Sequence, residues 1–161
     1  MTDSISSGYH RAMIDRQNDQ LIERLRIAGL RVTSPRLAVL EALGTRSHVD
    51  ADTIATAARQ RLGTLSAQAV YDILRAFGDA GLVRRIEPAG SPAVYETRVG
   101  DNHHHIVCRI CGSIADVDCV IDAAPCLAPS TASGYIVDEA EITFWGICPE
   151  CQRLRKENIH E

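Results

Sequence analysis

Two Cys-x-x-Cys pairs, Cys108–Cys111 and Cys148–Cys151, constrain the fold of this chain more than any other feature. Four thiolates on two such turns match the tetrahedral coordination of zinc, so the two turns are expected to meet. Because residues 112–147 exceed the usual spacing within a zinc ribbon, we expect a small domain between the pairs. Two metal-free dithiols and a thioredoxin-like redox pair are the alternatives.

All six cysteines lie between residues 108 and 151. Residues 1–19 lack the apolar core of a secretory signal, so a disulfide framework is a poor explanation for cysteines that the cytosol would keep reduced. No apolar run reaches the roughly 20 residues that a membrane-spanning helix needs. Apolar residues make up 45% of the chain, enough for a packed core. We expect a soluble, cytoplasmic protein with no membrane partner.

The charge is distributed unevenly along the chain. Residues 1–20 have a net charge of −1. Residues 21–90 carry ten arginines and seven acidic residues, a net charge of +3, whereas residues 91–161 have a net charge of −6. A basic front half joined to an acidic rear half that holds the cysteines indicates two modules, one of which could bind nucleic acid.

The front half carries the signals of several short helices followed by a hairpin. Apolar residues recur at helical spacing from Leu21 onward, and capping residues stand before three further helical patterns. These caps are Thr33, Asp50 and Ser66. Two extended segments follow, Leu82–Glu87 and Ala93–Glu96. This order predicts a winged helix, a fold that places one helix in the major groove of DNA.

The helix that begins after Ser66 is the predicted reading helix. Its outward side chains are Gln68, Tyr71, Asp72 and Arg75. A glutamine can pair with adenine and a tyrosine ring can contact a thymine methyl group, while arginines suit phosphates. The arginines available are Arg31, Arg75 and Arg84. Asp72 opposes DNA binding because a carboxylate repels phosphate, and a helical domain with a solvated basic face is the alternative.

A second metal pattern, Asp101-Asn102-His103-His104-His105, precedes the first cysteine pair. If residues 103–108 form a strand, His103 and His105 lie on one face and His104 on the other. Two imidazoles with nearby carboxylates suit ferrous iron, manganese or zinc. The candidate oxygen ligands are Glu96 and Asp116. A solvated loop is the alternative.

Cys119 and Cys126 belong to neither cysteine pair. Buried cysteines commonly serve as small apolar residues. A redox role would need an exposed thiol with a lowered pKa. We expect the two to pack as small apolar side chains and keep them as candidate redox residues in the alternative. Further along, Tyr135–Trp145 is predicted to form one long strand that leads to the second cysteine pair.

Taken together, these motifs resemble the ferric uptake regulator (Fur) superfamily of bacterial metal- and peroxide-responsive repressors. The resemblance runs from about residue 21 to residue 152 and is carried by AGLRVTSPRLAVLEAL, AVYDIL with DAGLVRR, VYETRVGDNHHHIVCRICG and CPEC. The stretches DNHHHIVCRICGSIADVDC and APCL are most similar to the actinobacterial branch that represses catalase-peroxidase genes.

The resemblance implies an α+β fold in a homodimer, with an N-terminal winged-helix DNA-binding domain and a C-terminal α/β dimerisation domain. The expected parts are a polar tail at 1–20, the DNA-binding domain at 21–96, the metal-binding dimerisation domain at 97–152 and a charged tail at 153–161. The four pair cysteines match a structural zinc site. Tyr71 matches the tyrosine of the recognition helix, and Arg31 matches a basic residue that approaches the minor groove.

The resemblance also implies a regulatory metal between the domains, ferrous iron or manganese with zinc as a substitute. Its ligands would be His48, Glu96, His103, His105 and Asp116. Three positions depart from the family pattern. Asp72 replaces a common arginine, Glu96 resembles iron- or zinc-sensing members instead of dedicated peroxide sensors, and Ala140 replaces a histidine of a third metal site found in some members.

The implied function is that of a metal-dependent repressor, not an enzyme, which binds a palindromic operator and releases it when peroxide oxidises an iron ligand. An iron- or zinc-uptake repressor of the same family is the first alternative. Two further alternatives come from other classes: a metal hydrolase on His103, His105 and Glu96, and a dithiol oxidoreductase on Cys148 and Cys151.

Overall fold

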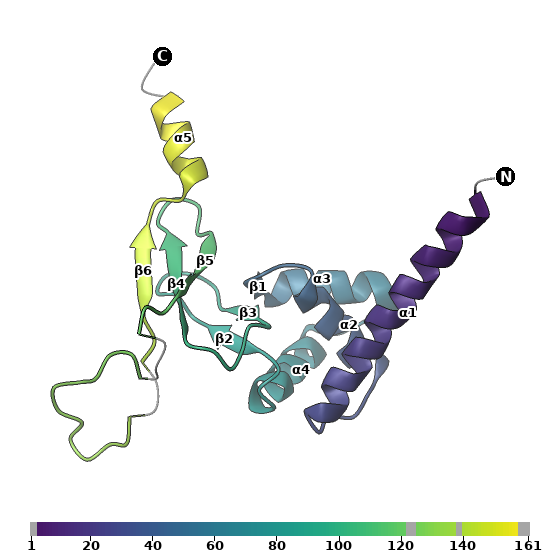
Figure 1. Ribbon diagram of the computed structural model, residues 1–161, viewed down its shortest axis with the longest axis horizontal. Coiled ribbons are helices and arrows are strands. Elements are labelled where there is room, and N and C mark those ends of the chain that lie inside the picture. Colours follow the sequence, from purple (N-terminus) through teal and green to yellow (C-terminus); the bar gives the residue numbers. More distant parts are fainter. Residues whose placement is uncertain (1–2, 122–124, 138–139, 158–161) are drawn as a thin grey trace. The chain divides into compact units, whose positions relative to one another are not determined.

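The computed structural model describes residues 3–121, 125–137 and 140–157, with side chains from residue 15 onward (Figure 1). The chain divides into two compact units. The first runs to Glu87 and includes residues 92–99, and the second holds residues 88–91 and continues from Gly100. Within the described part, none of the helices combines the length and the apolar character required to cross a membrane.

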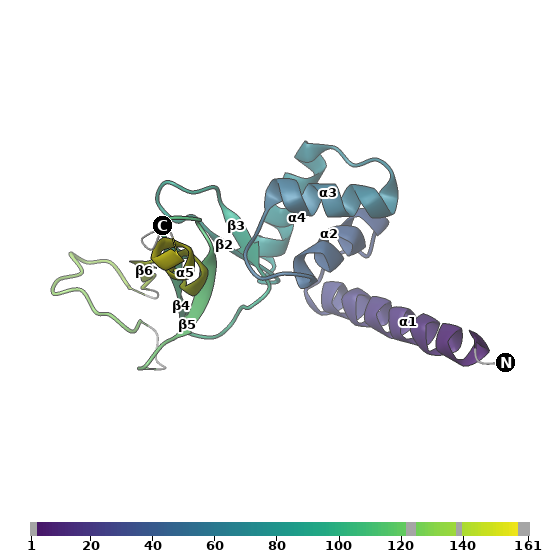
Figure 2. The same cartoon turned by 90° about the horizontal axis from the view of Figure 1, so that it is seen from above.

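The first unit consists of four helices and a small antiparallel sheet (Figure 2). The helices are α1 (Asp3–Ile27), α2 (Ser34–Gly44), α3 (Ala51–Leu62) and α4 (Ala67–Asp79). The strands are β1 (Val49–Asp50), β2 (Arg84–Ile86) and β3 (Val94–Glu96), in the order β1-β3-β2. Helices followed by a β2–β3 hairpin are the order that the sequence predicts for a winged helix.

The predicted caps start the three inner helices. The Thr33 side chain accepts a hydrogen bond from the backbone N–H of Arg36 at 3.4 Å. Asp50 Oδ1 accepts one from the N–H of Thr53 at 2.8 Å, and Ser66 Oγ accepts one from the N–H of Ala69 at 3.1 Å. Each cap satisfies a backbone donor that the first turn leaves open, so local sequence fixes where these helices begin.

One hydrophobic core holds the first unit together. It takes side chains from every helix, including the fully buried Leu25 of α1, Leu40 of α2, Ile54 of α3, Leu74 and Phe77 of α4. Burying each such side chain contributes about 1.5–3 kcal/mol. The core therefore fixes α4, whose outer face carries the predicted DNA-contacting residues, against α2 and α3.

Two features of the first unit differ from the expectation. Residues of the predicted polar tail belong to α1, which begins at Asp3 instead of near residue 21. The apolar pattern could not show this, since Leu21 is the first buried residue among the α1 side chains that the structure describes, from residue 15 onward. The two-residue strand β1 was also not expected. It exists because Val49 pairs with Tyr95 of β3, a long-range contact without a local signal.

The second unit is built on a three-stranded sheet. Its strands are β4 (His103–Cys108), β5 (Ile114–Asp118) and β6 (Thr143–Gly146), and helix α5 (Pro149–Glu157) follows. The strand order is β5-β4-β6, with β5 antiparallel and β6 parallel to β4. β4 is thus the central strand, and the predicted strand 103–108 has the bounds expected.

The predicted long strand Tyr135–Trp145 is wrong. Of its described residues, only those within β6 (Thr143–Gly146) lie in a strand, because that is the stretch that pairs with β4. Tyr135 and Ile136 are 80% and 97% exposed, and residues 138–139 lie outside the described part. At the other end, residues of the predicted charged tail continue α5 up to Glu157, where Arg153 pairs with Glu150 and Glu157 at 2.6 Å each.

Candidate metal centres

The three histidines of β4 occupy both faces of the sheet, as strand alternation requires. The rings of His103 and His105 meet edge to face, with centroids 4.9 Å apart. His104 points the other way and lies against the ring of Phe144 in β6, with centroids 6.4 Å apart. All three side chains are buried. The three consecutive histidines therefore place two imidazoles on one face of the sheet and one imidazole on the other.

Each histidine of the first face has a carboxylate beside it. Asp116 of β5 is the register partner of His105, and its Oδ1 lies 3.8 Å from His105 Nε2. Asp101, just before β4, places Oδ1 at 2.8 Å from His103 Nδ1. Imidazole nitrogens and carboxylate oxygens are donors that suit ferrous iron, manganese and zinc. This face of the second unit can supply nitrogen and oxygen ligands to one ion.

The first unit carries a similar pair. His48 Nε2 lies 3.2 Å from Glu96 Oε2, and the two side chains are only 4% and 2% exposed. His48 precedes β1 and has φ = 56°, a left-handed conformation that is uncommon outside glycine. Such strained conformations tend to occur at functional sites. The pair again combines an imidazole with a carboxylate taken out of water, a combination that favours a cation.

The predicted regulatory ligands are thus divided between the two units. The first unit holds His48 and Glu96, and the second holds His103, His105 and Asp116. Sequence reasoning did not identify Asp101 as a candidate ligand, although it stands next to the histidine run and contacts His103.

The four pair cysteines come together in the second unit. Their sulfurs lie within 4.8 Å of one another, and Cys111 Sγ is 3.7 Å from Cys148 Sγ. Zinc–sulfur bonds of about 2.3 Å in a tetrahedron separate the sulfurs by about 3.8 Å. The backbone N–H of Cys148 donates to Cys108 Sγ at 3.3 Å. The residues present therefore fit a tetrahedral zinc ion, and we call this group the four-cysteine site.

The electrostatics of the four-cysteine site also favour a cation. Backbone N–H groups of Cys111, Cys148 and Ile110 lower the pKa of the Cys108 thiol to about 6. Burial, followed by the neighbouring thiols, raises the pKa of Cys151 to about 12. Four thiols this close can all ionise only if a positive ion neutralises them. A bound dication would remove that repulsion.

The remaining two cysteines lie near the third histidine. The ligand atoms of His104, Cys119 and Cys126 lie within 4.8 Å of one another, and Cys126 Sγ is 3.2 Å from His104 Nε2. Burial raises the pKa of the Cys126 thiol, and the Cys119 thiol raises it further. A raised pKa makes Cys126 a weaker nucleophile at neutral pH, which counts against the predicted redox role for this residue.

The outward face of α4 holds a connected polar group. Asp72 Oδ1 accepts hydrogen bonds from Gln68 Nε2 at 3.0 Å and from Arg75 at 2.8 Å. The repulsive carboxylate noted in the sequence is therefore paired with a guanidinium on the same helix. Tyr71 is 49% exposed on this face. Gln68, Tyr71 and Arg75 all border one surface hollow that Arg85 of β2 also lines.

A family match identifies this architecture. The sequence of residues 27–125 matches the Ferric uptake regulator family. The chain belongs to this family. The Transcriptional regulator FurA of Mycobacterium tuberculosis is 60% identical over 129 residues, which cover 80% of this chain and 88% of the relative. Ferric uptake regulation protein 1 of Mycolicibacterium fortuitum is 53% identical over 131 residues, 81% of each chain.

A more distant relative is the Peroxide-responsive repressor PerR of Staphylococcus epidermidis, 31% identical over 141 residues, 86% of this chain and 93% of the relative. Among solved structures, the ferric uptake regulator Fur of Helicobacter pylori superposes with a TM-score of 0.64. It is 23% identical and covers 84% of this chain and 93% of that one. The predicted family and its α+β winged-helix architecture are confirmed.

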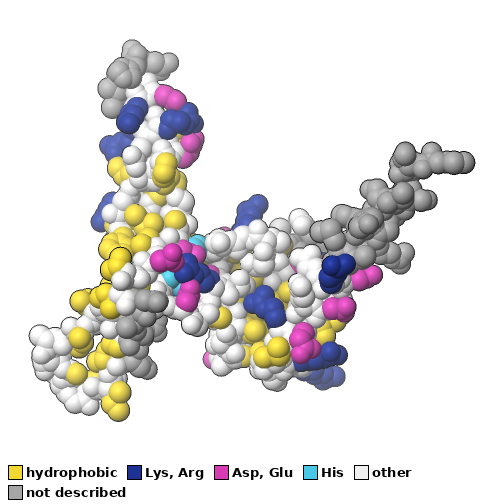
Figure 3. All heavy atoms as spheres, viewed as in Figure 1, with side chains coloured by type: hydrophobic (Ala, Val, Ile, Leu, Met, Phe, Trp, Pro, Cys, Tyr) yellow, Lys and Arg dark blue, Asp and Glu magenta, His cyan; other side chains and the backbone are white. Residues whose placement is uncertain are grey.

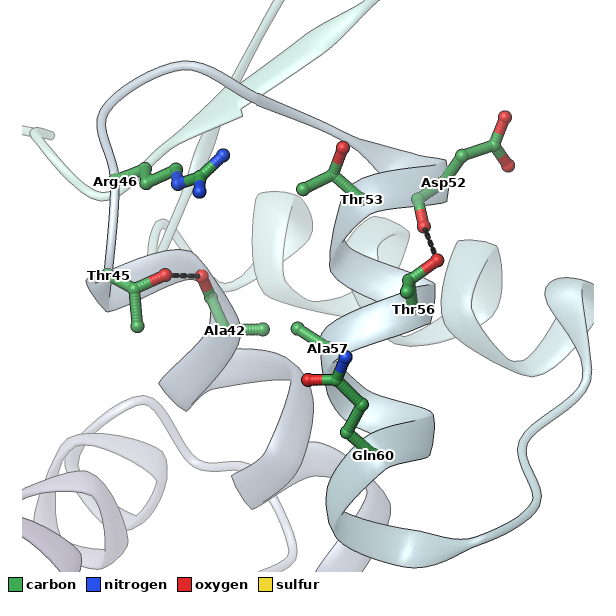
Figure 4. A pocket seen from close by; sticks show the side chains of 8 residues that line it. All are labelled: Ala42, Thr45, Arg46, Asp52, Thr53, Thr56, Ala57 and Gln60. Atoms are coloured by element: carbon green, nitrogen blue, oxygen red, sulfur yellow. Dashed lines mark hydrogen bonds between the residues drawn. The ribbon is translucent and has the colours of Figure 1, made fainter.

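The remaining predicted DNA-contacting residue of this Fur-family chain, Arg31, lies exposed between α1 and α2, where its carbonyl accepts a hydrogen bond from Arg36 at 2.9 Å. A separate hollow lies between the end of α2 and one side of α3 (Figure 4). Arg46 and Asp52 are its charged lining residues, and no histidine or cysteine lines it. It offers no metal ligands beyond one carboxylate, so the metal candidates remain those described above.

Proposed function

We propose that this Fur-family chain is a metal-dependent transcriptional repressor, which binds a palindromic DNA operator as a homodimer while a regulatory metal ion is bound. One observation carries the proposal. Each unit presents a buried histidine beside a carboxylate: His48 with Glu96 at 3.2 Å in the first, and His105 with Asp116 at 3.8 Å in the second. An ion that takes ligands from both groups would link the DNA-binding unit to the sheet unit.

Linkage gives such an ion its regulatory effect. A metal shared by two domains favours one interdomain arrangement over others. In a dimer that arrangement sets the spacing of the two α4 helices, which must match half-sites about one DNA turn apart or a multiple of it. Metal and operator then strengthen each other's binding by the same factor.

The surfaces of the two units support DNA and a second copy as partners. Exposed Gln68, Tyr71 and Arg75 of α4 suit base edges and phosphates. The second unit exposes apolar side chains near its sheet, among them Val120 (99%), Ile136 (97%) and Phe144 (45%). Figure 3 shows such side chains gathered over β6 and the loop segment before it. A contact with a second copy would take this apolar surface out of water.

The four-cysteine site would have a structural role. Zinc bound there would join the turn after β4 to the start of α5, and such sites contribute on the order of 10 kcal/mol of apparent binding energy to folding. In the regulatory site, ferrous iron or manganese would bind to the nitrogen and oxygen donors, with zinc as a substitute. The protein would act in the cytoplasm, where the chromosome lies.

We infer that the repressor responds to the supply of its regulatory metal. The relatives at 53–60% identity are named as a transcriptional regulator FurA and as ferric uptake regulation proteins, whereas the peroxide-responsive relative is 31% identical. Glu96 agrees with this reading, since it resembles the metal-sensing members. The uptake-repressor alternative is therefore favoured over peroxide release, and the names of the relatives favour regulation over the hydrolase and oxidoreductase alternatives.

Peroxide release remains a second candidate function. His103 and His105 lie edge to face with their ring centroids 4.9 Å apart, so iron held between them would bring any oxidant formed there against a ligand ring. Peroxide treatment of the iron form, followed by mass spectrometry, tests it. Added oxygen on either ring, together with loss of DNA binding, would support the candidate. Modification confined to cysteines would refute it.

Fluorescence anisotropy with an AT-rich palindrome from upstream of the gene tests the main proposal. Protein that keeps its tight zinc is compared with and without added manganese, at one fixed salt concentration because phosphate contacts make affinity salt-dependent. Manganese should strengthen binding to the palindrome and leave binding to a scrambled duplex weak. Equal affinity for both duplexes in both states would contradict the proposal.

A further inference from the structure

His104, Cys119 and Cys126 form a cluster that the regulatory and four-cysteine sites do not use. Strand alternation turns His104 to the face of β4 opposite His103 and His105. Cys119 directly follows β5, and Cys126 comes from the described segment that begins at residue 125. Three chain segments therefore meet on the face of the sheet away from His105 and Asp116.

The geometry of the cluster is that of a small chelating site. The imidazole nitrogen and the two sulfurs all lie within 4.8 Å of one another, and His104 Nε2 is 3.2 Å from Cys126 Sγ. In a tetrahedral zinc site, bonds of about 2.1 Å to nitrogen and 2.3 Å to sulfur separate these atoms by about 3.6 Å. The nitrogen–sulfur distance to Cys126 is within a few tenths of an ångström of that value, and no pair of ligand atoms is more than 4.8 Å apart, so small side-chain movements would let one ion contact all three.

The backbone and the neighbouring strand hold the first two ligands in position. The N–H of Cys119 donates to the carbonyl of Asn102 at 3.3 Å, which fixes Cys119 beside the residue before β4. His104 is only 5% exposed, and its ring is held against Phe144. Two of the ligands are therefore preorganised, and preorganisation lowers the entropy that binding must overcome.

The His104 ring has one nitrogen to offer to this cluster. Its Nδ1 is buried and has no hydrogen-bond partner among the residues that the structure describes, whereas Nε2 faces the sulfur of Cys126. With the proton on Nδ1, the lone pair of Nε2 is available on the side of the Cys126 sulfur. A buried imidazole nitrogen that faces one thiol and has a second thiol within 4.8 Å has the arrangement of a metal ligand.

The donor set selects the class of ion. Two thiolates and one imidazole are the ligands of zinc sites that keep a fourth position open to water or another ligand. Two negative sulfurs and a neutral ring also balance the charge of a dication, so a partly buried site would carry no net charge. Hard ions such as magnesium, calcium and manganese prefer oxygen donors, which this set lacks.

We propose that His104, Cys119 and Cys126 form a third metal site, which binds one zinc ion through one nitrogen and two sulfurs and leaves one coordination position open. The site is separate from the four-cysteine site, whose sulfurs it does not share, and from His103 and His105, which lie on the other face of β4. It assigns a ligand role to both cysteines that lie outside the Cys-x-x-Cys pairs.

Native mass spectrometry of the full-length, fully reduced protein tests this proposal by counting zinc ions per protomer after excess zinc is removed. We expect Cys126→Ser and His104→Ala each to hold one zinc fewer than the wild type. His105→Ala is the comparison variant: it removes a histidine from the other face of the same strand, and it can lose only the ion of the regulatory site. A His104→Ala, His105→Ala double variant should lose one more ion than His105→Ala alone. Circular dichroism checks that each variant folds.

A second measurement needs no variant. In protein whose four-cysteine site stays filled with zinc, added cobalt should produce sulfur-to-metal charge-transfer absorption, and zinc should slow alkylation of Cys119 and Cys126 in peptide maps. Equal zinc counts in wild type, Cys126→Ser and His104→Ala would overturn the proposal. So would absent charge-transfer absorption, or reduced thiols at 119 and 126 that react equally fast with and without zinc.

Discussion

The imidazole of His48 lies 3.2 Å from the carboxylate of Glu96, and both side chains are almost completely buried. Their residues are far apart in the sequence, and β3 brings them together by pairing with β1, which directly follows His48. A buried carboxylate needs a positive partner or hydrogen bonds to offset its desolvation. A cation bound by both side chains would offset the desolvation of this carboxylate, which is why we propose that metal binding acts on the DNA-binding unit through this pair.

Replacing His48 by Ala should weaken metal-dependent DNA binding. The variant removes one proposed regulatory ligand but none of the sulfurs of the four-cysteine site, so the structural zinc should be retained. Operator affinity in manganese should fall to that of the metal-free protein, measured by anisotropy. His48→Ala protein that lost its structural zinc as well would contradict this division between the sites.

Replacing Cys111 by Ser should remove the structural zinc and unfold the second unit. Cys111 Sγ lies 3.7 Å from Cys148 Sγ, and losing one of four thiolates removes much of a contribution on the order of 10 kcal/mol. Metal analysis and circular dichroism measure the two effects. Ser113→Ala is the matched control, because Ser113 contacts the same thiol at 3.3 Å but adds no sulfur ligand. Full zinc content in Cys111→Ser would be the contrary result.

Replacing Asp72 by Asn should tighten DNA binding. The change removes a negative charge from α4 and releases Arg75, now 2.8 Å from that carboxylate, to contact phosphate. An exposed ion pair of this kind is worth about 0.2–1 kcal/mol, so affinity should rise by roughly two- to fivefold at most. A steeper salt dependence should accompany the gain.

Glu23→Gln is the control for that measurement, because it breaks another exposed ion pair, with Arg26 of α1, away from α4. Its DNA affinity should change little. Weaker binding by Asp72→Asn would show instead that Asp72 positions Gln68, which also donates to its carboxylate.

The Asp50 cap should stabilise the first unit in a pH-dependent way. Hydrogen bonds from the Thr53 backbone, with a further one from its hydroxyl, lower the pKa of Asp50 below its ordinary 3.8. The stabilisation is therefore full above about pH 4 and is lost as pH falls through the lowered pKa. Asp50→Ala should lower the free energy of unfolding by about 1 kcal/mol at pH 7.

Chemical denaturation at pH 7 and pH 3 measures this loss. At pH 3 the difference between wild type and Asp50→Ala should shrink. Ser66→Ala removes a cap that does not titrate, so its effect should be the same at both pH values. An Asp50→Ala effect that grows in acid would contradict the sign of the shift.

Local signals predicted where α2, α3 and α4 begin, but not where α1 begins. Thr33, Asp50 and Ser66 cap helices because a single side chain satisfies a donor three residues on, which sequence shows directly. Strand pairing depends on partners far away, so β1 was missed and the stretch Tyr135–Trp145 was over-assigned. β6 pairs in parallel with β4, and only the fold reveals which four residues take part.

The candidate sites divide in the same way. Strand alternation alone predicted that His103 and His105 lie on one face. The Cys-x-x-Cys spacing alone predicted that the four pair cysteines form one metal site. The link from His104 to Cys119 and Cys126 was missed, since it depends on where the chain passes after β5. The sequence did place His104 on the opposite face of the strand from His103 and His105. Only the tertiary structure shows that two cysteines lie beside it.

The central claim is that regulatory metal and operator DNA strengthen each other's binding. The most direct test is manganese affinity, measured by competition with a metal-responsive dye, with and without saturating operator DNA. We expect operator DNA to raise manganese affinity by the same factor by which manganese raises operator affinity. Manganese affinity that is unchanged by the operator would contradict it.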